Sequence, residues 1–194
     1  MTTALDLAPQ AAEVARVIAG VRDDQLTDPT PCDGTSVAAM LDHFVGLTVA
    51  FRLGAEKAPM EGAPSADADH LPADWRERLP AQLDALVAAW DQPEAWDGTT
   101  EVGGVRMPAA AMGVVAANEV LVHGWDLAVA TGQPYAVDAL TAEACLEFNK
   151  GFAVGAPEAR DAMYGPVVPV PSDASLFDRL LGATGRDPAW APSR

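Results

Sequence analysis

The sequence has 194 residues, of which 49% are hydrophobic and 21% charged, so it suits one globular domain and is too apolar for a disordered chain. Its formal net charge of −16 disfavours nucleic acid and anionic membrane surfaces as partners. The first residues, MTTALDLAPQ, do not resemble a signal peptide, and no uncharged apolar run reaches the roughly 18 residues of a membrane span, so we expect a cytoplasmic protein.

Helical spacing of apolar residues predicts the first two elements of the chain. The first helix is expected from about Leu5 to Val21, because its apolar positions recur with a helical rather than an alternating period. A loop punctuated by prolines follows, and either Thr35 or Ser36 then serves as the N-cap of a second helix that reaches about Glu56. Residues 58–73 are polar and contain prolines, which predicts a loop.

The middle of the chain combines two helices with a short hairpin. A third helix is expected from about Asp74 to Asp91. Two short strands, Thr99–Val102 and Val105–Met107, flank a Gly-Gly pair that is typical of a tight turn. A fourth helix is expected over Pro108–Ala130, because proline suits the first helical position.

The last part of the chain is predicted to hold less regular structure. A fifth helix is expected over Leu140–Ala153, then a proline-rich loop, and then a short helix over Leu176–Leu181. The whole pattern predicts an all-α fold, a single domain over residues 1–194 built as a four-helix bundle with short extra helices and a small β-hairpin.

The three histidines are the first candidates for chemistry. His70 lies in the polar loop and is expected to be solvated. His43 lies at the edge of the apolar arc of the second helix, beside Met40 and Leu47. Taken alone, His43 is better explained as a structural histidine at the edge of the core, with its ring hydrogen-bonded, than as a metal ligand.

A second histidine shares a helix face with a carboxylate. Glu119 and His123 are four residues apart in the segment AANEVLVHGWDLAVA, so they stack on one face of the fourth helix. A carboxylate among Ala, Val and Leu needs a compensating charge, which a divalent cation held together with His43 would supply. Asp126 faces roughly the same way and could orient a metal ligand through a hydrogen bond. An exposed Glu–His pair is the alternative, and the spacing alone does not decide between the two.

Cys32 is a weaker candidate. It precedes a predicted helix start, where a thiolate would be stabilised by the helix dipole. It is also a small residue of a type that is often buried, and we favour that interpretation. The other cysteine, Cys145, lies far from it in the sequence, so both are expected to be free thiols.

Three segments resemble a known family. TPCDGTSVAAMLDHFVG, EVLVHGWDLAVATGQP and FDRLLGATGRDPAW are similar to the actinobacterial metal-binding branch of the DinB-like superfamily, whose members include mycothiol-dependent maleylpyruvate isomerases and related thiol S-transferases. The resemblance implies a four-helix bundle whose metal ligands are His43, Glu119 and His123. The sequence departs from the family pattern at Thr35, where a tryptophan is usual, and we expect it to lack the additional C-terminal domain of the isomerases. The first difference predicts a lost or replaced loop contact near the site, and the second argues against isomerase activity on maleylpyruvate.

The residues and the resemblance together favour a metal-dependent enzyme acting as a monomer or homodimer on a small molecule. The expected metal is a divalent ion, zinc before nickel, iron or cobalt, which would activate mycothiol for attack on a small electrophile. Substrate contacts are expected from loops 58–73 and 154–174. A hydrolase or Fe(II) enzyme using the same ligands, and a non-catalytic metal-dependent binding module, are the alternatives.

Overall fold

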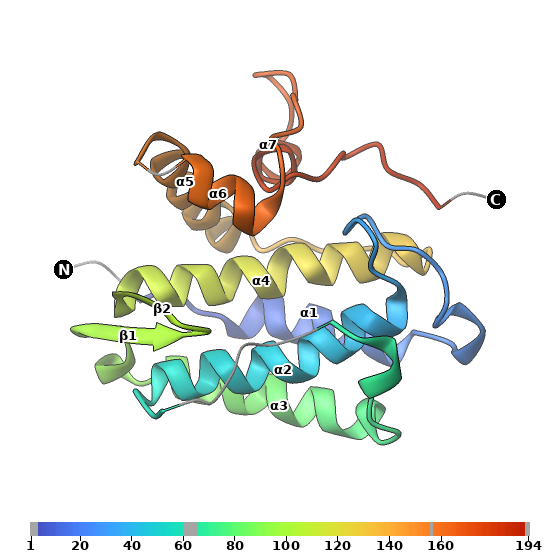
Figure 1. Ribbon diagram of the computed structural model, residues 1–194, viewed down its shortest axis with the longest axis horizontal. Coiled ribbons are helices and arrows are strands. Elements are labelled where there is room, and N and C mark those ends of the chain that lie inside the picture. The colour runs from blue at the N-terminus through green and yellow to red at the C-terminus, as the bar shows by residue number, and fades with distance from the viewer. Residues whose placement is uncertain (1–3, 60–65, 156, 193–194) are drawn as a thin grey trace.

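Four helices form a bundle, as the sequence predicts. The computed structural model describes residues 4–59, 66–155 and 157–192. The bundle helices are α1 (Ala8–Ala19), α2 (Val37–Ala55), α3 (Trp75–Trp90) and α4 (Ala109–Ala130). Helices α2 and α1 each pack against both α3 and α4 (Figure 1). Short 3₁₀ segments lie in the connections at Asp23–Gln25, Ala68–His70 and Pro93–Trp96.

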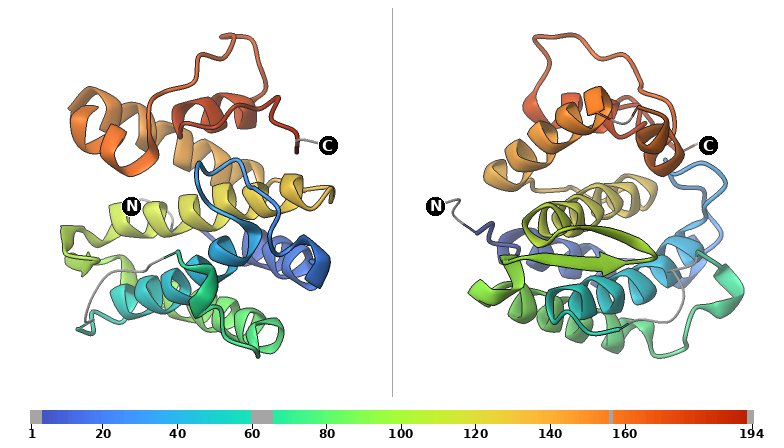
Figure 2. Two further views of the ribbon diagram at one scale, coloured as in Figure 1. Left: turned by 45° about the vertical axis from the view of Figure 1, so that its right-hand side comes forward. Right: turned by 60° about the vertical axis from the view of Figure 1, so that its left-hand side comes forward.

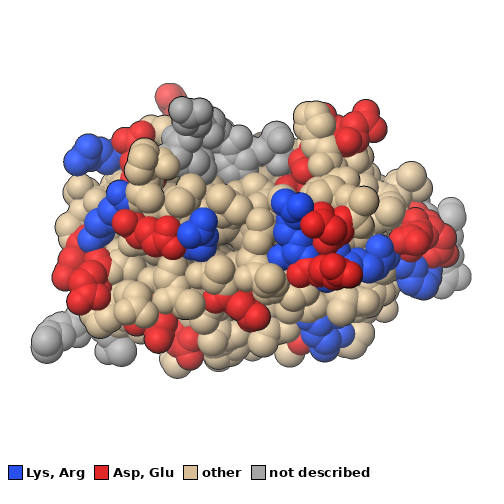
Figure 3. Space-filling model, turned by 90° about the horizontal axis from the view of Figure 1, so that it is seen from below, with Lys and Arg blue, Asp and Glu red and all other residues tan. Residues whose placement is uncertain are grey.

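The bundle core is filled by the apolar stripes of all four helices. Ile18, Phe44, Leu83 and Leu121, one from each helix, are fully buried. Burying side chains of this size stabilises the fold by about 1.5–3 kcal/mol each, before the entropy of ordering the chain is counted. Unlike this apolar core, the outer surface of the bundle is charged. Figure 3, which views the molecule from below, shows acidic and basic side chains interspersed on that face.

Helix α2 is the most apolar element of the bundle. Its N-cap is Ser36, one of the two predicted positions, and the hydroxyl accepts a hydrogen bond from the amide of Ala39 at 3.2 Å. By length and composition α2 could cross a membrane, but 67% of its most apolar window is buried inside the protein. Packing in the bundle core therefore accounts for its apolar character.

The predicted hairpin is present at one end of the bundle. Strands β1 (Thr99–Val102) and β2 (Val105–Pro108) pair antiparallel, with Val102 opposite Val105. Gly103 and Gly104 make the turn with φ values of +57° and +80°, which side chains rarely allow. The Thr100 hydroxyl donates to the carbonyl of Gly54 at 2.6 Å and so ties the hairpin to the end of α2.

Three further helices form a layer on the outer side of α4 (Figures 1 and 2). We call residues 139–192 the C-terminal layer; it contains α5 (Ala139–Gly155), α6 (Pro157–Tyr164) and α7 (Leu176–Ala183). Helix α5 packs against both α4 and α7. The prediction of a loop over 154–174 is wrong in its first half, where α6 lies. This eight-residue helix buries Arg160 and Tyr164. Because these buried side chains are polar, the sequence shows no apolar periodicity that would predict a helix here.

Candidate metal centre

The three predicted ligands meet in space. The Nε2 atom of His43 lies 3.5 Å from Oε2 of Glu119, and the Nε2 atom of His123 lies 3.2 Å from the same oxygen. Each of the three residues offers one potential ligand atom, and these three atoms lie within 4.8 Å of one another. The arrangement follows from local structure, because Glu119 and His123 are one helical turn apart on α4 and the packing of α2 against α4 adds His43.

The charges of this cluster depend on one another. Burial would raise the pKa of the Glu119 carboxyl, but hydrogen bonds from His123 and His43 outweigh it and hold that pKa below its usual range. Burial likewise opposes the charged form of His123, yet hydrogen bonds to Asp126 and Glu119 raise its pKa to about 10. In the metal-free protein a proton on His123 therefore compensates the partly buried carboxylate of Glu119.

The donor set fits a divalent cation. Two imidazole nitrogens and one carboxylate oxygen are ordinary ligands of zinc and neighbouring metals. Both histidines present Nε2 to the same carboxylate oxygen, so the three donor atoms converge on one place where a cation would bind. Their side chains keep 22% and 12% exposure, so the cluster borders solvent rather than being sealed in the core. Three protein ligands with an open side are typical of catalytic rather than structural sites.

Asp126 lies where the sequence predicts it. Its Oδ2 atom is 2.9 Å from Nδ1 of His123, while the carboxylate itself is completely buried. An acceptor at Nδ1 fixes the proton there and leaves Nε2 free to bind a metal. His43 differs, because its Nδ1 atom is buried without a hydrogen-bond partner among the described residues.

A cavity of about 650 Å³ opens above the cluster. Its walls come from the loop before α2, from α2 and α4, and from the C-terminal layer. The lining residues include Pro31, Cys32, Asp33, Thr35, Met40, His43, Asn118, Glu119, Val122, His123, Met163, Tyr164, Gly165, Pro166, Gly185 and Arg186. The volume lies within the usual range for small-molecule sites.

The cavity corrects the interpretation of Cys32. Its side chain is only partly buried and lines the cavity, so it is not a buried core residue. Thr35 lines the same wall, where the smaller side chain replaces the tryptophan usual in the resembling family. Of the predicted substrate loop 58–73, Ala66 reaches the cavity and residues 60–65 lie outside the described residues. His70 is exposed, as predicted.

Sequence reasoning missed three polar residues of the site. Arg186 is buried and forms an ion pair with Asp126 at 3.0 Å between Nη2 and Oδ2. Asn118 and Tyr164 line the cavity, and the amide of Asn118 lies 3.4 Å from the phenol oxygen. Burial and then the Glu119 charge raise the pKa of Tyr164, so its phenol stays protonated. The available signals for Arg186 were its place among small residues after the last helix and its position in FDRLLGATGRDPAW, one of the segments that resemble the family.

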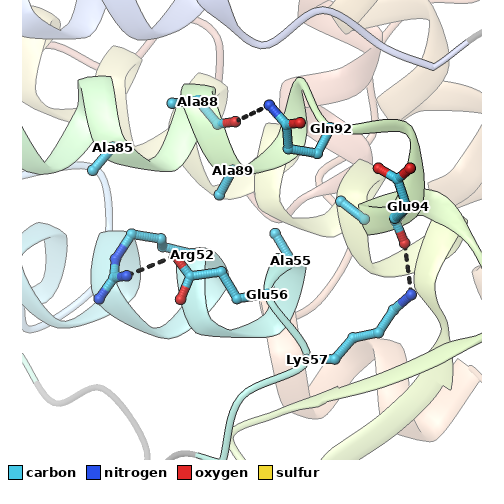
Figure 4. A pocket seen from close by; sticks show the side chains of 10 residues that line it. Arg52, Ala55, Glu56, Lys57, Ala85, Ala88, Ala89, Gln92 and Glu94 are labelled. Carbon is cyan, nitrogen blue, oxygen red and sulfur yellow. Dashed lines mark hydrogen bonds and ion pairs between the residues drawn. The ribbon is translucent and has the colours of Figure 1, made fainter.

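A second hollow, between α2 and α3, lies apart from this cluster (Figure 4). Alanines make up half of its lining residues, and two of its basic side chains already have partners. Arg52 pairs with Glu56 at 2.7 Å, and the Lys57 ammonium donates to the Glu94 carbonyl at 2.6 Å. Among the described residues, the hollow shows no cluster of potential metal ligands like that of the candidate metal centre.

The fold and the cluster define a helical-bundle protein with a candidate metal centre of two histidines and one glutamate. The chain belongs to the family of the mycothiol maleylpyruvate isomerase N-terminal domain, whose model matches residues 7–128 and so spans the triad and Asp126. Two uncharacterised proteins of Mycobacterium tuberculosis, from strains CDC 1551 / Oshkosh and ATCC 25618 / H37Rv, are each 30% identical, with 89% of this chain and 91% of theirs covered. No solved structure gives a significant match.

Proposed function

We propose that this protein binds one divalent metal ion, preferably zinc, and activates a low-molecular-weight thiol of the mycothiol type for attack on a small electrophile in the cytoplasm. It would act as a single domain, in a monomer or homodimer. The observation that carries the proposal is the convergence of His43, Glu119 and His123 within 4.8 Å at the floor of an open cavity. Family membership supports the choice of thiol.

The residues of the chain have separate tasks in this scheme. When bound, the cation supplies Lewis acidity that lowers the pKa of a thiol. Glu119 contributes one negative charge and the two histidines none when neutral, so the centre retains positive charge to attract a thiolate. Asp126 holds His123 through Nδ1 at 2.9 Å. The walls from the C-terminal layer limit the water around the reacting atoms.

The proposed reaction needs no reactant other than the thiol and the electrophile. The thiol loses its proton to solvent, and the sulfur electron pair forms a bond to the electrophilic carbon. With 1-chloro-2,4-dinitrobenzene as probe, chloride leaves with the electrons of the carbon–chlorine bond, and the thioether is the product. We expect zinc-loaded protein to accelerate this reaction at pH 7 with mycothiol or a close analogue.

The test compares two histidine variants. His43→Ala removes a proposed ligand and should abolish both zinc retention and acceleration. His70→Ala removes an exposed histidine, 69% accessible at its side chain, and should behave like the wild type. Equal zinc content and equal rates in all three proteins would contradict the proposal.

The same donor set keeps a second function open. Two histidines and one carboxylate also hold Fe(II) in oxygenases, and with zinc they can activate water. Zinc-dependent hydrolysis of p-nitrophenyl acetate without any thiol would favour a hydrolase. Oxygen consumption that depends on iron would favour the Fe(II) enzyme. Tight ligand binding without turnover under any of these conditions would favour a metal-dependent binding module.

A further inference from the structure

A line of three charged or polar side chains leads from the candidate metal centre into the C-terminal layer. Nδ1 of His123 lies 2.9 Å from Oδ2 of Asp126, and Nη2 of Arg186 lies 3.0 Å from the same oxygen. The Nε atom of Arg186 approaches the other carboxylate oxygen at 3.4 Å. Arg186 comes after α7 and lies outside residues 7–128, the part matched by the family model. The line therefore joins the part of the chain that the family model matches to a residue outside that match.

The hydrogen-bond chemistry of this line selects one histidine tautomer. Arginine can only donate and an ionised carboxylate can only accept. Nδ1 of His123 is therefore able either to donate to Asp126 at 2.9 Å or to accept from Arg186 at 3.4 Å. The shorter contact is the one with Asp126. A proton on Nδ1 leaves the lone pair of Nε2 on the side of His43 and Glu119, as a metal ligand requires.

Arg186 also explains a second group of potential ligands. One atom each from Cys32, His123 and Asp126 lie within 4.8 Å of one another. The guanidinium of Arg186 is already paired with Asp126, and its Nη1 atom donates to the Thr184 carbonyl at 2.7 Å. The positive charge that this second group could attract is thus supplied by the protein itself.

We propose that Arg186 is a positioning residue of the metal centre, which holds the Asp126 carboxylate and through it the ring of His123. The C-terminal layer is then a functional part of the site and not merely a cover over it. This inference rests on the proposed metal site, since without a metal at the triad there is nothing for the line to orient.

The physical reason is the burial of Asp126. Its carboxylate has no exposed surface, and a buried charge is tolerated only when it is paired and hydrogen-bonded. Arg186 meets the need with two donors from one planar group, which fixes the carboxylate in orientation as well as in charge. Without this partner the carboxylate would lose its fixed orientation, and His123 would lose its fixed acceptor.

The test is a double-mutant cycle on zinc affinity, measured by competition with a chromophoric chelator. Loss of a partner that orients a ligand costs about 10- to 100-fold in metal affinity, and we expect Asp126→Asn to fall in this range and Arg186→Met near its lower end. Because Arg186 acts through Asp126, the double variant should bind zinc about as weakly as Asp126→Asn alone. The double variant also removes both members of the buried pair, which keeps the test informative if Arg186→Met alone does not fold.

Cobalt supplies a readout that a purely structural role would not change. We expect the visible d–d spectrum of cobalt-loaded protein to shift in Arg186→Met and to return towards that of the wild type in Arg186→Lys, which keeps the charge. Arg76→Met is the control, since Arg76 pairs with Asp23 at 2.8 Å and donates to the Val21 carbonyl at 2.9 Å, among residues that do not line the cavity. It should lower stability without altering zinc affinity.

The outcomes separate this inference from the proposed function. If the wild type binds no divalent metal at the triad, the proposed function fails and the inference fails with it. If the wild type binds zinc and Arg186→Met binds it equally with an unchanged cobalt spectrum, the inference alone is overturned. Additive losses in the double variant would also overturn it, because they would show that Arg186 does not act through Asp126.

Discussion

The bundle and the C-terminal layer contribute to the same cavity in different ways. Helices α2 and α4 supply every atom of the candidate triad. The C-terminal layer supplies no member of the triad, but it provides part of the cavity wall and the arginine that pairs with Asp126. The potential ligand atoms thus lie on regular helices, whose spacing and packing fix their positions. The residue that pairs with Asp126, and so holds the ring of His123, comes instead from the C-terminal layer. The two regions should respond differently to substitution.

The largest effect is expected from removing a ligand in the bundle. His123→Ala leaves two of three protein ligands, so the protein should lose most of its metal as measured by elemental analysis. Tyr164→Phe, in the wall from the C-terminal layer, should retain the full amount. If His123→Ala retained its metal in full, His123 would not be a ligand. The expected difference between ligand residues and cavity-wall residues would then be contradicted.

The next effect concerns the residue at which the two regions meet. Asp126→Asn should weaken zinc affinity by about 10- to 100-fold without unfolding the chain. The amide is isosteric, so circular dichroism should be unchanged. An unchanged zinc affinity would assign Asp126 to the packing between the regions and not to the metal centre.

The dependence of affinity on pH follows from the protonated state of His123. Burial lowers the pKa of His123, but hydrogen bonds to Asp126 and Glu119 overcome this and raise it to about 10. Below that pKa the free protein carries a proton that zinc must displace, so zinc affinity rises with pH and levels off above the pKa. One displaced proton corresponds to about a tenfold gain per pH unit between roughly pH 7 and 9. Calorimetry in buffers of different ionisation enthalpy measures that proton, and zinc binding without proton release would contradict the assignment.

The smallest effect is a contrast between two buried glycines. A Cβ at Gly113 in the bundle would lie 2.5 Å from the Trp96 ring, and one at Gly182 would lie 2.6 Å from the Val168 carbonyl oxygen. Each substitution by alanine should destabilise the protein by about 1–3 kcal/mol in urea unfolding. Only Gly182→Ala should also weaken zinc binding, because Arg186 follows shortly after it. Equal zinc affinities in the two variants would show that the packing of the C-terminal layer does not affect the metal centre.

The same two regions show what the sequence could predict. The bundle helices and the hairpin follow from local periodicity and turn residues, and each was predicted within a few residues. Helical spacing predicted that Glu119 and His123 share a face, whereas the addition of His43 to them was implied by the family resemblance. Helix α6 was missed because it buries Arg160 and Tyr164 rather than an apolar stripe. Arg186 was missed because its partner Asp126 is 60 residues away, a distance at which spacing carries no information. Cys32 was misjudged because the exposure of a loop residue depends on what packs over it.

The most direct test of the central claim is the spectrum of cobalt-loaded protein with a thiol added. Thiolate bound at the metal should add a sulfur-to-metal charge-transfer band in the near ultraviolet. The band should appear near pH 7, where a free thiol with a pKa of about 8.5 is mostly protonated. We predict this band with mycothiol or a close analogue, and its absence in His43→Ala. Binding of water or a small anion to the cobalt, without the band for any low-molecular-weight thiol, would contradict thiol activation.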